Sequence, residues 1–101
     1  MKLYDLAHSR TGDKGNISTI SVIAYEESDF LLLKNQVTAE RVLEHFQKIG
    51  ATKVERYVID SLCALNFVLH DTLGGGVTRS LALDTHGKTL SGWMLELVLH
   101  P

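Results

Sequence analysis

The middle of the chain, residues 17–60, alternates between strand and helix patterns, and this order constrains the fold most strongly. Residues 17–25 are rich in β-branched side chains and alternate between two faces, which predicts a strand. Residues 37–50 space their apolar side chains at helical intervals, and residues 52–60 alternate again. A β-α-β unit is therefore predicted, and its apolar faces are best buried by a sheet with helices packed on one side.

The helix of this unit carries recognisable signals at both ends. Thr38 is predicted to be the N-cap, because its hydroxyl can accept a hydrogen bond from an unpaired backbone N–H. Val37 and Val42 stand at the two positions of a hydrophobic staple around that cap. Gly50 is predicted to end the helix, because glycine readily adopts the left-handed conformation found after many helices.

The segments on either side of this unit complete the predicted order. Residues 61–73 fit both a leucine stripe at helical spacing and a strand alternation, and Ser61 as a cap together with the segment's length favours a helix. The predicted class is α+β: a ferredoxin-like sandwich with a mostly antiparallel sheet of four to five strands and two helices on one face. The other predicted elements are strands at residues 2–8, 79–84 and 93–99, a short helical segment at 26–36 and a helical turn at 88–92.

Length, charge and cysteine content exclude several classes of protein. The 101 residues suffice for one domain, residues 1–101, and are too few for two. The formal net charge of −2 argues against nucleic-acid binding, which relies on an excess of basic residues. The single cysteine, Cys63, allows no internal disulfide. With no secretory signal and no apolar run of membrane-spanning length, we expect a cytoplasmic protein without membrane contact.

Residues 10–16, RTGDKGN, combine glycine with fixed charge and are predicted to form a loop between two strands. The glycines would let backbone N–H groups converge on one point, and Arg10 and Lys14 would surround that point with positive charge. This composition suits an anion-binding loop that includes Gly15 and Asn16. The alternative is a tight turn in which Asp13 bonds its own backbone and pairs with a neighbouring base; residue types alone favour the turn.

Residues 74–79, GGGVTR, form a second motif of glycine and charge. Three consecutive glycines lose much backbone freedom on folding, so their presence needs a reason. They could let the backbone approach a ligand closely, with a hydroxyl and a guanidinium nearby, or they could form a connector or a bend where two backbones touch. The candidate ligand-binding residues of this motif are Gly74, Gly75, Gly76, Thr78 and Arg79.

Side chains suited to catalysis or metal binding do not follow a recognisable pattern. The five histidines contain no HxxxH or HxH pair and are accompanied by one cysteine, so no metal site, cofactor or catalytic residue is predicted. His8 and His70 border the two glycine motifs and could meet in space. A pairing with Asp13 or Asp71 would then support acid–base chemistry, although a structural role is favoured for each histidine.

Taken together, the two motifs resemble the small C-terminal domain of the acyclic terpene utilisation protein A (AtuA) family. The blocks HSRTGDKGN, TAERV, LNFVL, GGGVTRSL and LDTHGK carry this resemblance in one order across most of the chain. It implies a ferredoxin-like domain that, in the larger family, follows a large N-terminal domain and is associated with the breakdown of terpenoid or branched acyl-CoA compounds. Because that large domain is absent here, the resemblance implies a partner subunit, with ligand or partner contacts at the charged and glycine residues of the two motifs.

Three functions are consistent with these features. The favoured one is a non-catalytic accessory subunit that pairs with itself and with a large AtuA-like protein, and whose two motifs hold an anionic small molecule or a partner's carboxylate. The second is a small enzyme acting on an anionic, CoA-type substrate between the motifs, with Asp13 or His70 moving a proton. The third is a structural oligomerisation module that uses Trp93 and the face formed by Met94, Glu96 and Val98.

Overall fold

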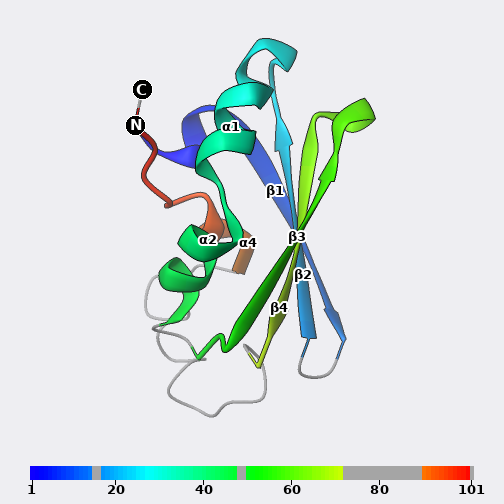
Figure 1. Cartoon of the computed structure of the whole chain (residues 1–101), viewed down its shortest axis with the longest axis vertical. Coiled ribbons are helices and arrows are strands. Elements are labelled where there is room, and N and C mark those ends of the chain that lie inside the picture. Colours follow the sequence, from blue (N-terminus) through cyan, green and yellow to red (C-terminus); the bar gives the residue numbers. More distant parts are fainter. Residues whose placement is uncertain (15–16, 48–49, 72–89, 101) are drawn as a thin grey trace.

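The computed structural model describes residues 1–14, 17–47, 50–71 and 90–100, without the side chains of Asp13 and Lys14. One layer of helices packs against one layer of strands (Figure 1). With η denoting a 3-10 helix, the elements are η1 (Leu3–Asp5), β1 (Ala7–Lys14), β2 (Ile17–Ala24), η2 (Glu27–Asp29), α1 (Phe30–Gln36), α2 (Ala39–Phe46), β3 (Lys53–Ile59), η4 (Asp60–Leu62), β4 (Ala64–His70) and α4 (Leu90–Met94).

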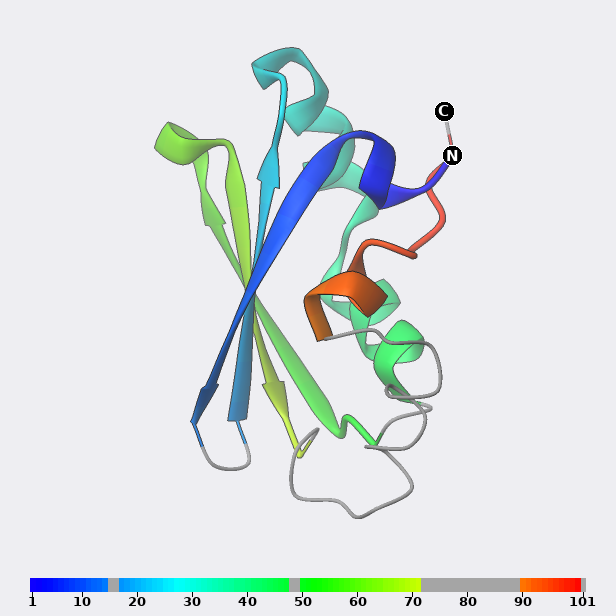
Figure 2. The ribbon, with the colours of Figure 1, turned by 180° about the vertical axis from the view of Figure 1, so that it is seen from behind.

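The described strands form one four-stranded sheet in the order β1-β2-β4-β3. Every neighbouring pair is antiparallel, so β2 and β3 run parallel to each other with β4 between them. This is the split β-α-β arrangement of a ferredoxin-like fold, and the predicted α+β class is confirmed. The helices α1, α2 and α4 all lie on one face of the sheet, and no described helix covers the other (Figures 1 and 2).

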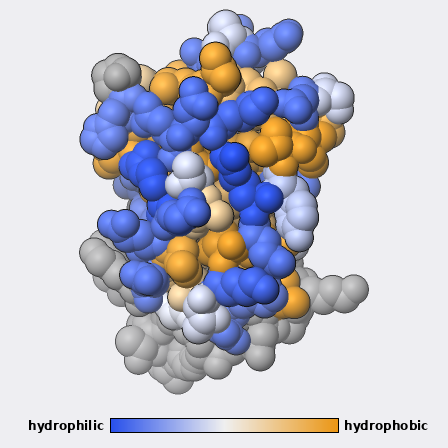
Figure 3. All heavy atoms as spheres, viewed as in Figure 1, coloured by the Kyte–Doolittle hydropathy of each residue, from blue (hydrophilic) through white to orange (hydrophobic). Residues whose placement is uncertain are grey.

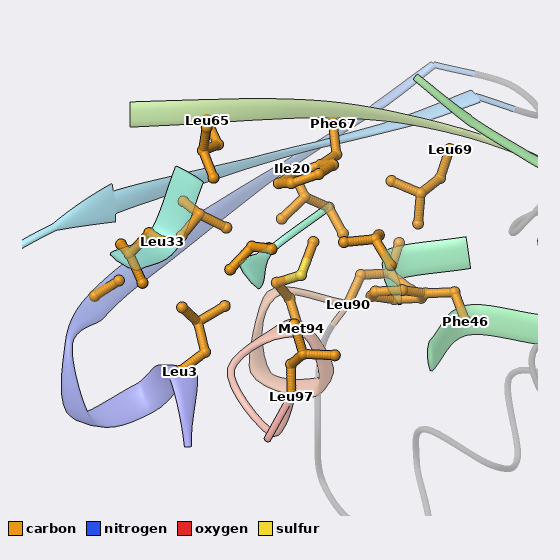
Figure 4. Packing of buried hydrophobic residues seen from close by; sticks show 14 of the residues in the cluster. Leu3, Ile20, Leu33, Phe46, Leu65, Phe67, Leu69, Leu90, Met94 and Leu97 are labelled. Atoms are coloured by element: carbon orange, nitrogen blue, oxygen red, sulfur yellow. The ribbon is translucent and has the colours of Figure 1, made fainter. Parts of the chain in front are cut away.

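The core fills the space between the sheet and this helical layer (Figure 4). Alternate side chains of the two central strands point into it, and each such apolar side chain stabilises the fold by roughly 1.5–3 kcal/mol relative to exposure. The sheet contributes Ile20, Val22, Leu65, Phe67 and Leu69, all 0% exposed, and the opposite layer contributes Leu3, Leu33, Val42, Phe46 and Met94, also 0% exposed.

The signals at the start of the central helix are confirmed for α2. Thr38 is the N-cap, and its Oγ1 accepts a hydrogen bond from the backbone N–H of Arg41 at 3.2 Å. Val37 and Val42 are both fully buried, as expected for the staple. α2 ends at Phe46 with Gln47 as its C-cap, so it stops before the predicted end at Gly50, although Gly50 has the predicted left-handed conformation with a φ of 99°.

The helix predicted for residues 61–73 is wrong. The chain makes the short η4 turn, reverses at Cys63 with a φ of 50°, and continues as the strand β4. The alternation of Leu65, Phe67 and Leu69 places all three in the core, while the backbone of β4 pairs with β2 on one side and β3 on the other. Hydrogen bonding to two strands distant in sequence therefore overrides the helical spacing of the leucines.

The two ends of the chain also differ from prediction. Residues 2–8 were predicted as a strand, but they contain η1, and β1 begins only at Ala7. Residues 93–99 were predicted as a strand, but Trp93 lies in α4, and beyond that helix only an isolated bridge joins Val98 to Lys2. The predicted strand at residues 79–84 lies outside the described residues. Met1 and Leu99 lie side by side, so the first and last described segments of the chain meet (Figure 1).

Candidate functional site

The first glycine motif is mostly strand rather than loop, which corrects the prediction for residues 10–14. β1 pairs with β2 up to Lys14, which lies opposite Ile17. Because β1 lies at the edge of the sheet that the described strands form, its charged residues have a structural use: they discourage pairing with strands of other molecules. Gly15 and Asn16 fall between the two strands and outside the described residues.

Gly12 has a steric role in this hairpin rather than a conformational one. Among the glycines that the structure describes, only Gly50 has a positive φ. A Cβ atom on Gly12 would lie 2.9 Å from Thr19 Oγ1, a distance that side chains essentially never adopt. Thr19 Oγ1 in turn donates a hydrogen bond to the Gly12 carbonyl at 3.2 Å. The glycine therefore makes room for this cross-strand contact.

The second motif, with Gly74, Gly75, Gly76, Thr78 and Arg79, lies outside the described residues. The strand that precedes this motif, β4, is described and ends beside the β1–β2 hairpin. His70, the last residue of β4, pairs with Ile17, the first residue after the β1–β2 turn. The next residue, Asp71, accepts a hydrogen bond from the Thr52 hydroxyl. The chain thus leaves β4 at the same end of the sheet as the hairpin that carries the first motif.

The expected meeting of His8 and His70 is wrong. His8 pairs with Ile23 at one end of the sheet, whereas His70 lies at the other, about 20 Å away along the strands. The His8 ring stacks on Tyr25 with centroids 5.5 Å apart. His70 Nε2 lies 3.1 Å from Glu55 Oε2, a partner that only the strand register reveals.

A row of polar side chains crosses the uncovered face of the sheet from one edge to the other. The register aligns Arg10 of β1, Ser21 of β2, Asn66 of β4 and Tyr57 of β3. Ser21 Oγ donates a hydrogen bond to Asn66 Oδ1 at 2.8 Å. The Arg10 guanidinium is exposed and has no hydrogen bond or ion pair with the part of the chain that the structure describes. We call these four residues the polar row.

A shallow hollow of about 330 Å³ adjoins the polar row on the same face. The Ser21–Asn66 pair forms its polar side, and the remaining walls are apolar. The hollow lies at the end of the sheet where β3 connects to β4. Hydrophobic residues gather over this end at the upper right of Figure 3. The lining residues are Ser21, Ile23, Ile59, Leu62, Ala64 and Asn66.

Comparison with protein families identifies the fold. A model of the AtuA ferredoxin-like domain matches residues 1–100. The chain belongs to this family. The match includes both glycine motifs and all four strands of the sheet, as the resemblance of the sequence blocks implied. No curated protein and no solved structure matches the chain.

A second hollow of this AtuA ferredoxin-like domain, about 520 Å³, lies between α2 and the C-terminal segment, with Arg41, His45 and Trp93 in its lining. The His45 and Trp93 rings stack with centroids 4.6 Å apart, and Trp93 Nε1 donates to the His45 carbonyl at 2.9 Å. The Arg41 guanidinium donates to the Val98 carbonyl. These contacts fasten the C-terminal segment to α2.

The interface predicted on the Trp93 side of the domain therefore does not form one exposed face. Met94 is 0% exposed and belongs to the core, and Trp93 packs against that core. Glu96 pairs with Lys2 at 3.1 Å, and only Val98, at 50% exposure, presents a sizeable apolar surface.

Neither a metal cluster nor a membrane span is found within residues 1–14, 17–47, 50–71 and 90–100. No three His, Cys, Asp or Glu side chains among them gather closely enough to hold a metal ion. None of their helices has the length and apolar character that crossing a membrane would require.

Proposed function

We propose that this AtuA ferredoxin-like domain is a non-catalytic accessory subunit. It binds an anionic group at the end of the sheet that carries the β1–β2 hairpin. The observation that supports this is the pairing of Ile17 with His70, which brings the hairpin of the first motif beside the strand that leads into the second. Both motifs consist of glycine and fixed charge, the composition of sites that hold anions through backbone N–H groups and basic side chains. Binding is therefore better supported than chemistry.

The anionic group is either a CoA-type small molecule or a carboxylate of a partner protein. The proposed partner is a large AtuA-like protein of acyl-CoA or terpenoid catabolism, in keeping with the family to which the domain belongs. The candidate contact residues at this end are Lys14, Gly15, Asn16, Gly74, Gly75, Gly76, Thr78 and Arg79, with Asp13 beside them. Arg10 lies four residues back along β1, about 13 Å from Lys14, so we assign it to the polar row instead.

A second candidate function, a small enzyme, is favoured by one contact at the same end of the sheet. His70 Nε2 and Glu55 Oε2 lie 3.1 Å apart, and both side chains are about one third exposed. A carboxylate that orients an imidazole is a common arrangement in acid–base catalysis. In this alternative His70, positioned by Glu55, moves a proton on a CoA-type substrate held by the two motifs.

Co-expression with a tagged large AtuA-like protein tests the proposal. The domain should co-purify with the tagged protein, and Lys14→Ala and Arg79→Ala should reduce the amount recovered. Lys34→Ala is the matched control, because Lys34 pairs with Asp60 at 2.8 Å, beyond the opposite end of β3. A domain that always elutes alone would exclude the accessory role. Turnover of a CoA thioester by the domain alone, abolished in His70→Gln, would establish the enzyme instead.

A further inference from the structure

The uncovered face of the sheet exposes large side chains with apolar surface, both within the polar row and beside it. Tyr25, Tyr57 and Leu62 are 60%, 51% and 65% exposed, and Leu62 forms part of the hollow beside Ser21 and Asn66. Exposed apolar surface next to polar groups is a common feature of protein–protein contacts. We infer that this face joins two copies of the chain in a symmetric dimer. This interface is independent of the anion site proposed at the β1–β2 hairpin.

Charge selects the symmetry of this dimer. A two-fold axis parallel to the strands, between β2 and β4, lays β1 of one copy across β3 of the other. Arg10 then lies over Tyr57 of its partner and close to the partner's Glu55, so its guanidinium meets an aromatic face and a carboxylate. A two-fold axis across the strands would instead lay Arg10 over Arg10, and repulsion between like charges disfavours it.

The centre of the polar row is self-complementary under the same axis. Ser21 of one copy lies over Asn66 of the other, because these residues occupy paired positions on the two central strands. Asn66 Oδ1 accepts the hydrogen bond from Ser21 within one copy, and its amide nitrogen has no partner among the described residues. That amide can therefore donate across the interface.

The size of the face is sufficient for a specific interface. Four strands about 4.8 Å apart, paired over seven positions at about 3.3 Å per residue, outline a face of about 19 × 23 Å. Side-chain relief adds to this flat outline, so two such faces bury on the order of 1,000–1,200 Å² in total, the lower limit for specific complexes. A dimer of moderate affinity is expected, with its apolar contacts concentrated around Tyr57 and Leu62.

Light scattering and sedimentation of the purified chain test this inference. The unmodified chain should be a dimer at concentrations of tens of micromolar. Leu62→Glu should raise the dimer dissociation constant by on the order of 100-fold, because it would bury a charge among apolar side chains at the interface. Leu31→Glu is a close control: Leu31 on α1 has the same 65% exposure but lies in the helical layer. Circular dichroism should show that both variants fold.

Reversal of charge tests the orientation of the two copies. Arg10→Glu and Glu55→Arg should each weaken the dimer by about tenfold, and the double variant should recover affinity because opposite charges again face each other. A monomeric unmodified chain, or equal dissociation by Leu31→Glu and Leu62→Glu, would overturn the inferred interface. A dimer sensitive to Leu62→Glu in which the double variant shows no recovery would overturn the inferred symmetry.

Discussion

The two faces of the single β-sheet are built from alternate residues of the same strands, yet they differ in nearly every property. On the covered face, Leu65, Phe67 and Leu69 are fully buried in one cluster with side chains of α1, α2 and α4. On the open face, Tyr57 and Asn66 form part of a polar row beside an apolar hollow. The covered face therefore determines stability, whereas no described helix packs over the open face (Figures 1 and 2).

Truncation of one aromatic residue on each face tests whether the covered face alone determines stability. Of the stability comparisons, it should give the largest difference in the free energy of unfolding. Phe67→Ala should lower the free energy of unfolding by about 3–5 kcal/mol, because it leaves a cavity in the core. Tyr57→Ala should lower it by about 1 kcal/mol or less, since Tyr57 is 51% exposed. Urea unfolding of dilute, monomeric protein measures both values. Similar losses in the two variants would contradict the division of roles.

Two arginines, one on each face, give a second comparison, in which the expected difference in stability is smaller. Arg56 lies on the covered side of β3, and its Nη1 donates to the carbonyls of Lys34 and Val37 at 2.7 and 3.1 Å. Arg56→Ala should cost about 1.5–3 kcal/mol, because those carbonyls at the end of α1 lose a charged donor. Arg10→Ala should change monomer stability by at most about 0.5 kcal/mol. The comparison fails if thermal unfolding shows the two substitutions to be equivalent.

Two threonines give the smallest and most specific comparison. Thr11 Oγ1, on the covered side of β1, is buried and has no hydrogen-bond partner among the described residues. Thr11→Val should therefore stabilise the fold by about 1 kcal/mol, since it removes an unpaired polar group. Thr19→Val should destabilise it by about 0.5 kcal/mol, because its hydroxyl bonds the Gly12 carbonyl. The opposite signs are the decisive result, and chemical denaturation at low concentration resolves them.

Local signals predicted the parts of the fold that local interactions determine. Thr38 marks the start of α2 through a hydrogen bond within a few residues of the chain, whereas α2 ends at Phe46, before the predicted stop at Gly50. Leu65 and Leu69 fit both a helix period and a strand period, so only pairing with β2 and β3 decides between them. Residues 93–99 alternate like a strand, but α4 and its contact with His45 take precedence.

The sequence revealed the members of the candidate sites that stand out by residue type, but not those that are brought together by strand pairing. Arg10 was predicted to be a basic residue of a candidate anion-binding loop, because glycine and charge are rare in strands; in the structure Arg10 lies in β1, at the edge of the described sheet. Tyr57, Asn66 and Glu55 were missed because their proximity depends on the register of three strands. Recognition of the β3–β4 hairpin from its alternating residues would have revealed all three.

The bridge between the two chain ends has a practical consequence. Leu99 N donates to the Met1 carbonyl at 2.7 Å, so the first residue of the domain and a residue close to its described C-terminal end are neighbours in space. A short linker could join them, and new ends could be opened in the exposed η4 turn without displacing any strand. Such a circular permutant should keep the same sheet, while its ends would emerge beside the open face and could carry a fluorescent reporter of its occupancy.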